Sequence, residues 1–387
     1  MKRQDVLTFV AYAFMLAIAL VVGIVVIYQN GILQDLKSSG EQIGVTIASL
    51  TVAFILHTII FELAHIVGAK IGGYDVTRVN FFFFNFEKNN ENKFKFSLKS
   101  FDGLVGETCI TPKEGVIKEP NPKPFLWFGA IFYAIQLIGG ITFLVLNPGL
   151  ATDSTLIIIL RAYVIFHITL GGMLLLYAIF PAKLDTKNDG YYIAICNGAT
   201  NVKAFNLMLT VEETVRRGLP APKMESFQDI TEFTAKINIL IAADNVIDNR
   251  FEDAISAIAP VLIDEKEVVS SRTKLAATAE KISALIFLGS LEEATSVYNE
   301  LPIERKKILT NDKSLAGLRI NLIITAIIED SFAESLISYR EFRKKTVKSQ
   351  ELLLGSDGVL FQKGMNLIAK LKPNFDYEGS NTLPNNK

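Results

Sequence analysis

The chain has 387 residues, half of them hydrophobic, and a formal net charge of −1. A charge so close to zero argues against a nucleic-acid partner. The two cysteines, Cys109 and Cys196, lie far apart, which excludes a disulfide framework and a Cys-x-x-Cys metal pair. The length allows two domains, and the apolar residues are concentrated in the first half.

Four long apolar segments in the first half predict transmembrane helices. They cover about residues 6–28, 43–72, 124–148 and 156–182. About 20 apolar residues in a helix cross a bilayer core of about 30 Å. The first segment is longer than the apolar region of a cleaved signal peptide, which has about 7–15 residues, so we expect it to be retained.

Residues 75–111, between the second and third spans, predict a small β insertion. R-V-N-F-F-F-F-N-F is rich in strand formers, a polar turn follows, and Phe94, Phe96 and Leu98 then alternate with lysine and serine. This pattern indicates a β-hairpin with one apolar face. That face either packs on the membrane domain or lies at the bilayer interface; alternatively, its edge strand captures an extended peptide.

Four spans place both termini on one side of the membrane. Lys2, Arg3, the lysines of the hairpin, Lys183 and Lys187 share that side, whereas the opposite loops carry little besides Lys37. Positive charge is enriched in cytoplasmic loops. We therefore expect a multi-pass protein of the cell membrane, in contact with the lipid bilayer, whose N-terminus and C-terminal domain are cytoplasmic.

From about residue 201 the composition becomes that of a soluble helical domain. Three similar segments recur there at a spacing of 40 to 41 residues: 251–258, 291–298 and 332–339. Such repeats stack as helical hairpins, and the tetratricopeptide type has the closest pattern. We expect a soluble domain over 201–373, either irregular and without a ligand or with a concave surface for a protein partner, and a disordered tail over 374–387.

The predicted fold is therefore mostly α. It consists of a polytopic transmembrane domain over residues 1–200, with about four membrane helices and the β-hairpin insertion, followed by a soluble α-helical, tetratricopeptide-like domain. The second span contains H-T-I-I-F-E-L-A-H at residues 57–65. Ionisable side chains inside a membrane are costly and mark a functional site by default.

Glu62 and His65 have the spacing of the zinc motif His-Glu-x-x-His, but Phe61 stands where the first histidine belongs. In that motif the two histidines bind one zinc ion, and the glutamate is the general base for the metal-bound water. A third ligand comes from elsewhere in the chain. Asp189, just after the fourth span and before a glycine, is the natural candidate.

F-E-L-A-H at 61–65, the V-G-A-K-I-G-G-Y that follows, the strand region and N-D-G at 188–190 together resemble the site-2-protease-like family of intramembrane zinc metallopeptidases. The resemblance covers about residues 40–200 and is to a compact bacterial branch with an N-D-G motif. It implies Glu62 as catalytic base and His65 and Asp189 as zinc ligands. Phe61 departs from the family pattern, because phenylalanine cannot bind a metal.

Two other histidines are candidate substitutes for the missing ligand. His57 precedes His65 by eight residues, about 12 Å along a helix axis. Two nitrogens bound to one zinc ion lie within about 4 Å of each other, so His57 qualifies only if the helix is kinked or unwound. His167, in the fourth span, either ligates the metal or is hydrogen-bonded between helices. We expect zinc binding to be weak or absent.

Three functions follow, and the sequence leaves open whether the chain is an enzyme. The first is a metallopeptidase homologue with lost or impaired zinc chemistry, a pseudoprotease that binds a membrane-associated peptide or partner. The second is an active intramembrane zinc metalloprotease with an unusual ligand set and Glu62 as its base. The third is a membrane-anchored scaffold that acts through its C-terminal helical domain.

Overall fold

The computed structural model describes residues 6–34, 36, 38–89, 93–98, 106–113, 119–147, 155–182, 188–216, 224–264, 267–347 and 355–377. The chain divides into two compact units, Met1–Arg217 and Gly218–Lys387. The break therefore comes after Arg217, later than the domain boundary at 200 that composition indicates. Residues 217–223, at this break, lie outside the described residues.

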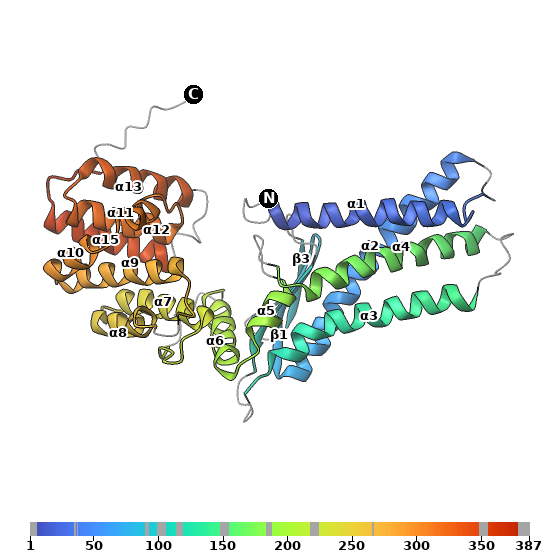
Figure 1. The fold of residues 1–387 in the computed structure, drawn as a ribbon, viewed down its shortest axis with the longest axis horizontal. Helices are drawn as coiled ribbons and strands as arrows, with labels where there is room; N and C mark the ends of the chain where they lie inside the picture. Colours follow the sequence, from blue (N-terminus) through green and yellow to red (C-terminus); the bar gives the residue numbers. More distant parts are fainter. Residues whose placement is uncertain are drawn as a thin grey trace. The chain divides into compact units, whose positions relative to one another are not determined.

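The described part of the first unit contains four helices that are long and apolar enough to cross a membrane, which confirms the four long apolar helices predicted from the sequence. They are α1 (Val6–Gln29), α2 (Ser39–Gly72), α3 (Pro122–Leu146) and α4 (Thr155–Ile179). Helices α2, α3 and α4 pack on one another, and α1 packs on α4 (Figure 1). The arrangement is compatible with a multi-pass membrane protein.

Local sequence signals end α2 and begin α3, and a backbone hydrogen bond joins these two helix ends. Gly73 adopts a left-handed conformation with φ 86°, which terminates α2. Asn121 caps α3 by accepting a hydrogen bond from the Lys123 amide, and Pro122 occupies the first turn. The Asn121 amide also donates to the Gly72 carbonyl oxygen at 2.8 Å. The two spans therefore meet at one point.

The β insertion is a four-stranded antiparallel sheet in the order β3-β2-β1-β4. Its strands are β1 (Tyr74–Phe81), β2 (Phe84–Lys88), β3 (Phe94–Leu98) and β4 (Gly106–Pro112). The prediction of a single hairpin is wrong in extent. The phenylalanine run turns at Phe82, with φ 52°, where none of the usual turn residues gives a signal.

The sheet lies beside α2 rather than beyond its end. Strand β1 starts directly after Gly73, and the following turn brings the Phe82 ring to 5.9 Å from the Phe54 ring of α2. Phe54 precedes Gly72 by 18 residues, about 27 Å along the helix axis. The strands thus run back along α2.

Two shorter helices complete the first unit, α5 (Asp189–Ile195) and α6 (Ala199–Arg216). The N-D-G motif opens α5, with Asn188 as its N-cap. Helix α6 packs against β4. Its Asn206 accepts a hydrogen bond from the Tyr74 hydroxyl at 2.5 Å and donates to the Pro120 carbonyl oxygen at 3.0 Å. One side chain therefore ties α6 to the start of the sheet and to the loop before α3.

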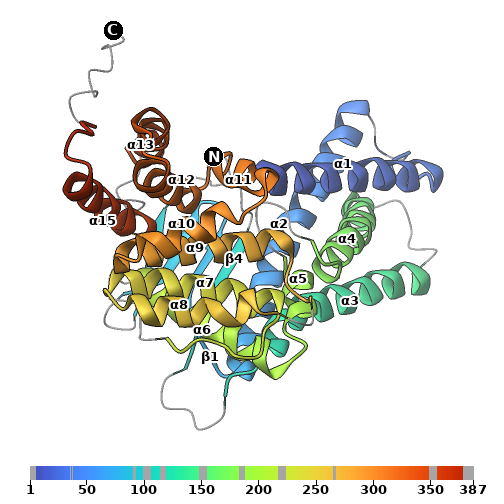
Figure 2. The ribbon, with the colours of Figure 1, turned by 60° about the vertical axis from the view of Figure 1, so that its left-hand side comes forward.

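The described part of the second unit is helical (Figure 2). Its helices are α7 (Glu232–Ile247), α8 (Phe251–Leu262), α9 (Ser271–Leu288), α10 (Leu291–Asn299), α11 (Ile303–Thr310), α12 (Leu315–Ile323), the π-helix η1 (Ile324–Ile328), α13 (Phe332–Thr346) and α15 (Ser356–Leu371). The three repeated segments each begin a helix, namely α8, α10 and α13.

The core of the second unit contains a buried ion cluster and an aromatic C-terminus. Arg319 is 1% exposed and bonds both Glu280 and Asp357. Tyr377 is also buried, and its hydroxyl donates to Ser335 Oγ at 2.7 Å. The prediction of a disordered tail from residue 374 is therefore wrong for 374–377. Phe375 and Tyr377 pack against the core of the unit despite the polar composition of the tail. Residues 378–387 of the expected tail lie outside the described chain.

Candidate intramembrane site

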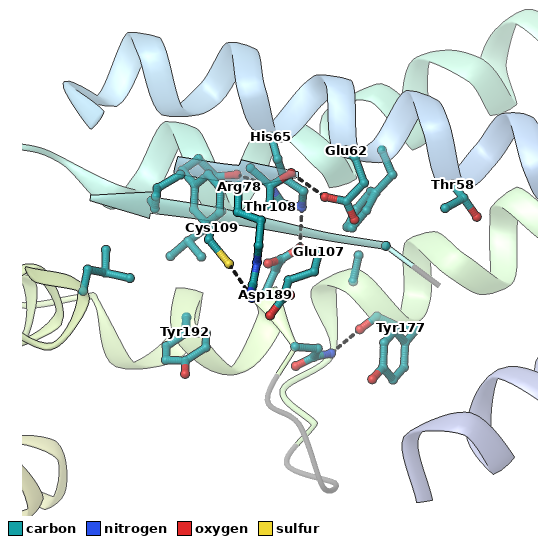
Figure 3. A pocket seen from close by; sticks show the side chains of 18 of the residues that line it. Thr58, Glu62, His65, Arg78, Glu107, Thr108, Cys109, Tyr177, Asp189 and Tyr192 are labelled. Carbon is teal, nitrogen blue, oxygen red and sulfur yellow. Dashed lines mark hydrogen bonds and ion pairs between the residues drawn. The ribbon is translucent and has the colours of Figure 1, made fainter. Parts of the chain in front are cut away.

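The first unit encloses a cavity of about 680 Å³ between α2, the sheet, α5 and α6. It contains the predicted catalytic base and both predicted ligands (Figure 3). The acidic and basic residues on its wall are Glu62, His65, Arg78, Glu107, Asp189, Glu212 and Glu213. The wall also carries Cys109 and the tyrosines Tyr12, Tyr133, Tyr177 and Tyr192. The predicted base Glu62 and the predicted ligands His65 and Asp189 therefore share one site.

His65 and Asp189, 124 positions apart in the chain, lie side by side. His65 Nε2 is 3.2 Å from Asp189 Oδ2. The other ring nitrogen, Nδ1, donates to the Phe125 carbonyl oxygen at 2.8 Å. A carbonyl oxygen only accepts, so Nδ1 carries a proton, and Nε2 is the nitrogen that faces the carboxylate. This is the orientation of a histidine that ligates a metal, whose second nitrogen bonds a backbone carbonyl.

Asn188 positions Asp189. Its Oδ1 accepts from the Tyr191 amide at 3.0 Å, which caps α5. Its Nδ2 donates to the Phe180 carbonyl oxygen at 2.8 Å, at the end of α4. A Cβ at Gly190 would lie 2.4 Å from a carbonyl oxygen of α4, so only glycine allows the close approach. The N-D-G motif thus holds Asp189 against the fourth span.

Glu62 is 3% exposed and bound to the sheet. Its Oε2 accepts a hydrogen bond from Thr108 Oγ1 at 2.5 Å. Thr108 belongs to β4, so the predicted base and the edge strand are in direct contact (Figure 3). Sequence reasoning missed Thr108, because nothing in its spacing shows that β4 returns to the second span.

A packed aromatic ring fills the position of the missing ligand. The Phe61 ring meets the His65 ring edge-on, with centroids 4.5 Å apart, and stacks on Tyr133 at 4.9 Å. Gly129 of α3 makes room for it: a Cβ there would lie 2.3 Å from the Phe61 ring. The space that a ligand would need is therefore occupied by a hydrophobic contact.

These residues do not fit a three-ligand zinc centre. Zinc in a catalytic site is held by three protein ligands. Within the described ranges, no group of three or more His, Cys, Asp and Glu side chains is placed to hold a metal ion. His65 and Asp189 offer two donors, and Phe61 offers none. No zinc-dependent step is derived from this geometry.

The structure does not bring His57 or His167 to His65. The His57 Nε2 donates to the His167 carbonyl oxygen at 2.9 Å, and the two rings stack at 4.3 Å. Neither histidine lines the cavity. Tyr133 separates them from Phe61, because its ring contacts His57 at 5.4 Å and Phe61 at 4.9 Å. The pair is hydrogen-bonded between helices.

The sheet supplies a polar wall that the sequence did not reveal. Arg78 Nη2 donates to Glu107 Oε2 at 2.8 Å and lies 3.2 Å from Cys109 Sγ. Asn80 donates to the same Glu107 oxygen at 2.9 Å. Burial raises the pKa of the Cys109 thiol to about 12. Cys109 is therefore a neutral thiol and a poor nucleophile.

Strand β4 also supplies backbone to the cavity. It is the last strand of the described sheet and pairs with β1 alone. Residues 106–110 all line the cavity. The Lys113 amide donates to Gly73 on the β1 side at 3.2 Å, and alternation then directs the Ile110 amide to the open edge. Such an edge can accept an additional strand.

Comparisons of the chain with protein-family models, with curated proteins and with solved structures found no match. The resemblance to the site-2-protease-like family therefore rests on the residues themselves. Of those residues, Phe61, Glu62, His65, Asn188 and Asp189 line the cavity.

Proposed function

We propose that this protein is a membrane-embedded, site-2-protease-like homologue that has lost zinc chemistry and binds a membrane-associated peptide. The carrying observation is the position of β4, whose open edge lines the same cavity as Glu62, His65 and Asp189. An extended peptide paired with this edge would lie against those side chains.

The loss of zinc chemistry is supported by Phe61 and its surroundings. A ring packed between Tyr133, His65 and Gly129 leaves no donor atom at the third ligand position. Retention of the rest of the site is consistent with a binding function. The lysine distribution supports a location in the cell membrane with the termini and the C-terminal domain in the cytoplasm.

The peptide-binding function is tested with a backbone substitution at the open edge. Ile110→Pro removes the amide that points away from β1, whereas Ile110→Ala shortens the same side chain and keeps the amide. The probe is a labelled synthetic peptide with one leucine-rich span and an unstructured polar flank, in detergent. Binding by fluorescence anisotropy should be lost with proline and kept with alanine. Equal affinities for both variants would refute strand addition at β4.

One observation favours an active metalloprotease as the second candidate. His65 keeps the carbonyl hydrogen bond and the carboxylate neighbour of a metal-ligating histidine, and Glu62 remains beside it. The metal content of the purified protein separates the candidates. Stoichiometric zinc in the unaltered chain, with cleavage lost in Glu62→Gln, would establish the active enzyme. If zinc is bound only after the substitution Phe61→His, the natural chain has lost zinc binding.

The C-terminal helices have a separate proposed role. We infer that the helices starting at Phe251, Leu291 and Phe332 form tetratricopeptide-like hairpins that hold a protein partner. In a scaffold, deletion of residues 218–387 would abolish partner binding and leave the membrane unit intact. If pull-down of the partner survives the deletion, the scaffold hypothesis fails.

A further inference from the structure

The β2–β3 hairpin has an apolar face that no described part of the chain covers. This face consists of Phe84, Phe86, Phe94, Phe96 and Leu98. All are exposed, from 37% for Phe86 to 69% for Leu98, and β3 is the last strand on its side of the sheet. A contiguous exposed apolar surface marks an interaction site.

The register places the apolar side chains of the hairpin on one face and most of its polar side chains on the other. Phe84 pairs with Leu98, and Phe86 pairs with Phe96, whose ring centroid is 5.3 Å away. The alternate positions are polar: Asn85 Nδ2 donates to Ser97 Oγ at 2.9 Å. Because side chains alternate across a strand, the five apolar side chains share one face, which also carries Lys88 opposite Phe94 at its end, and the other face is polar. The hairpin is therefore an amphipathic surface.

The neighbourhood of this face is the bilayer rather than bulk water. The turn that leads into β2 places Phe82 against Phe54, and β4 bonds Glu62 through Thr108. Both contacts lie well inside α2, a helix with the length and hydropathy of a membrane span. A hairpin attached to a sheet at this level has lipid within reach.

The charge around the face fits an anionic lipid surface. Residues 84–99 carry four lysines and two glutamates. The Lys88 ammonium lies 5.8 Å above the centre of the Phe94 ring, so cation and apolar face are adjacent. Amphipathic segments with aromatic residues on one face and lysines on the other lie in the membrane interface and prefer anionic lipids.

We propose that the apolar face of the β2–β3 hairpin is a lipid-binding surface that inserts at the acyl–headgroup boundary of an anionic leaflet. This surface is separate from the peptide-binding edge, because β3 and β4 are opposite edges of the sheet. The ligand is the bilayer itself. The polar face, with Ser97 and Lys95, remains in contact with water.

The test uses single-tryptophan reporters in the full chain. Trp127, the sole native tryptophan, is replaced by phenylalanine, and one reporter is introduced by Phe94→Trp, Phe96→Trp, Lys95→Trp or Ser97→Trp. Each variant is reconstituted in phosphatidylcholine vesicles that contain brominated acyl chains. Quenching should be at least about twofold greater at 94 and 96 than at 95 and 97. Equal quenching at all four positions overturns the proposal.

The charge requirement is tested in the Phe96→Trp reporter by raising the fraction of phosphatidylglycerol. Quenching should rise with that fraction, and replacing Lys88, Lys93 and Lys95 by glutamine should abolish the rise. An unchanged rise in the glutamine variant would overturn the anionic preference. Phosphatidylcholine alone gives the baseline for both proteins.

A protein occupant would give a different pattern. If a second copy covers the face, emission at 96 will be blue-shifted equally in detergent and in vesicles, without quenching by brominated lipid, and the proposal fails. Folding is checked by the thermal midpoint of each reporter. The peptide-affinity difference between Ile110→Pro and Ile110→Ala is independent of these readings, so failure of one proposal is distinguishable from failure of the other.

Discussion

Phe61 and Gly129 interlock: a Cβ atom on Gly129 would lie 2.3 Å from the Phe61 ring, closer than van der Waals contact permits. Phe61, which stands where the His-Glu-x-x-His motif has its first histidine, is thus matched by a residue of α3. The match couples the two positions energetically, and that coupling can be measured.

Gly129→Ala should destabilise the protein by about 1–3 kcal/mol, because the added methyl group overpacks the contact. Gly139→Ala is the matched control on the same helix, since a Cβ there meets nothing within 4 Å. In the background Phe61→Ala, the cost of Gly129→Ala should largely disappear. Thermal unfolding in detergent provides the comparison, and additive effects of the two substitutions would contradict the contact.

Thr108→Val should destabilise the protein by about 1–3 kcal/mol, because it leaves a buried carboxylate of Glu62 without its hydroxyl donor. Valine keeps the shape of threonine, so the change isolates the hydrogen bond. Thr108→Ser keeps the donor and should recover most of the loss. If valine and serine give the same unfolding midpoint, the hydrogen bond contributes nothing to stability.

Asn188→Ala should expose the start of α5 to exchange. The substitution removes the cap and the bonds that tie this helix to α4, at a cost of about 0.5–2 kcal/mol for the cap alone. Amide hydrogen exchange of residues 189–195 measures the effect directly. Asn201→Ala, which removes one bond to the Ile195 carbonyl oxygen, is the comparison and should change less.

Arg319→Met should strongly destabilise the second unit, by about 3–5 kcal/mol, because it leaves the buried Glu280 carboxylate unpaired. The paired change Arg319→Met with Glu280→Met removes both charges and should recover much of that loss. Urea unfolding of the full chain measures the loss of stability, and amide hydrogen exchange in α9, which contains Glu280, locates it. A double variant as unstable as the single one would be inconsistent with this account.

Glu232 makes the stability of the second unit depend on pH. Burial alone raises its pKa, but hydrogen bonds from Lys236, Ser270 and Thr273 outweigh burial and hold the pKa below its ordinary value of 4.5. A depressed pKa means that the stabilisation is present above pH 4.5 and is lost as pH falls through the folded-state value. Glu232→Gln should flatten this acid-side dependence in thermal unfolding scans between neutral and acidic pH.

Much of the membrane unit could be predicted from the chain alone. Apolar runs of sufficient length indicate the four spans, and the N-D-G motif indicates the start of α5, because both signals are local. The path of the sheet could not be predicted in this way. A turn at Phe82 inside a phenylalanine run carries no turn residue, and the pairing of β4 with β1 is a contact between distant segments.

In the candidate site too, residues with a local sequence signal could be predicted, and residues related only by tertiary contacts could not. Glu62, His65 and Asp189 could be identified because they are ionisable residues in or beside apolar helices. Thr108 could not, since a threonine in a strand is unremarkable until the strand is placed. Phe61 was visible as a departure from a motif, but its complement Gly129 was not, because only packing relates them.

The hydrogen bonds of Asn206 fix the position of α6 in the first unit. This helix lines the cavity with Phe205, Met208 and Leu209, and Asn206 anchors it to the first strand and to the loop before α3. The chain continues directly from α6 to the second unit. Because α6 is the last helix of the first unit and also part of the cavity wall, a displacement of its C-terminal end would change the volume of the cavity.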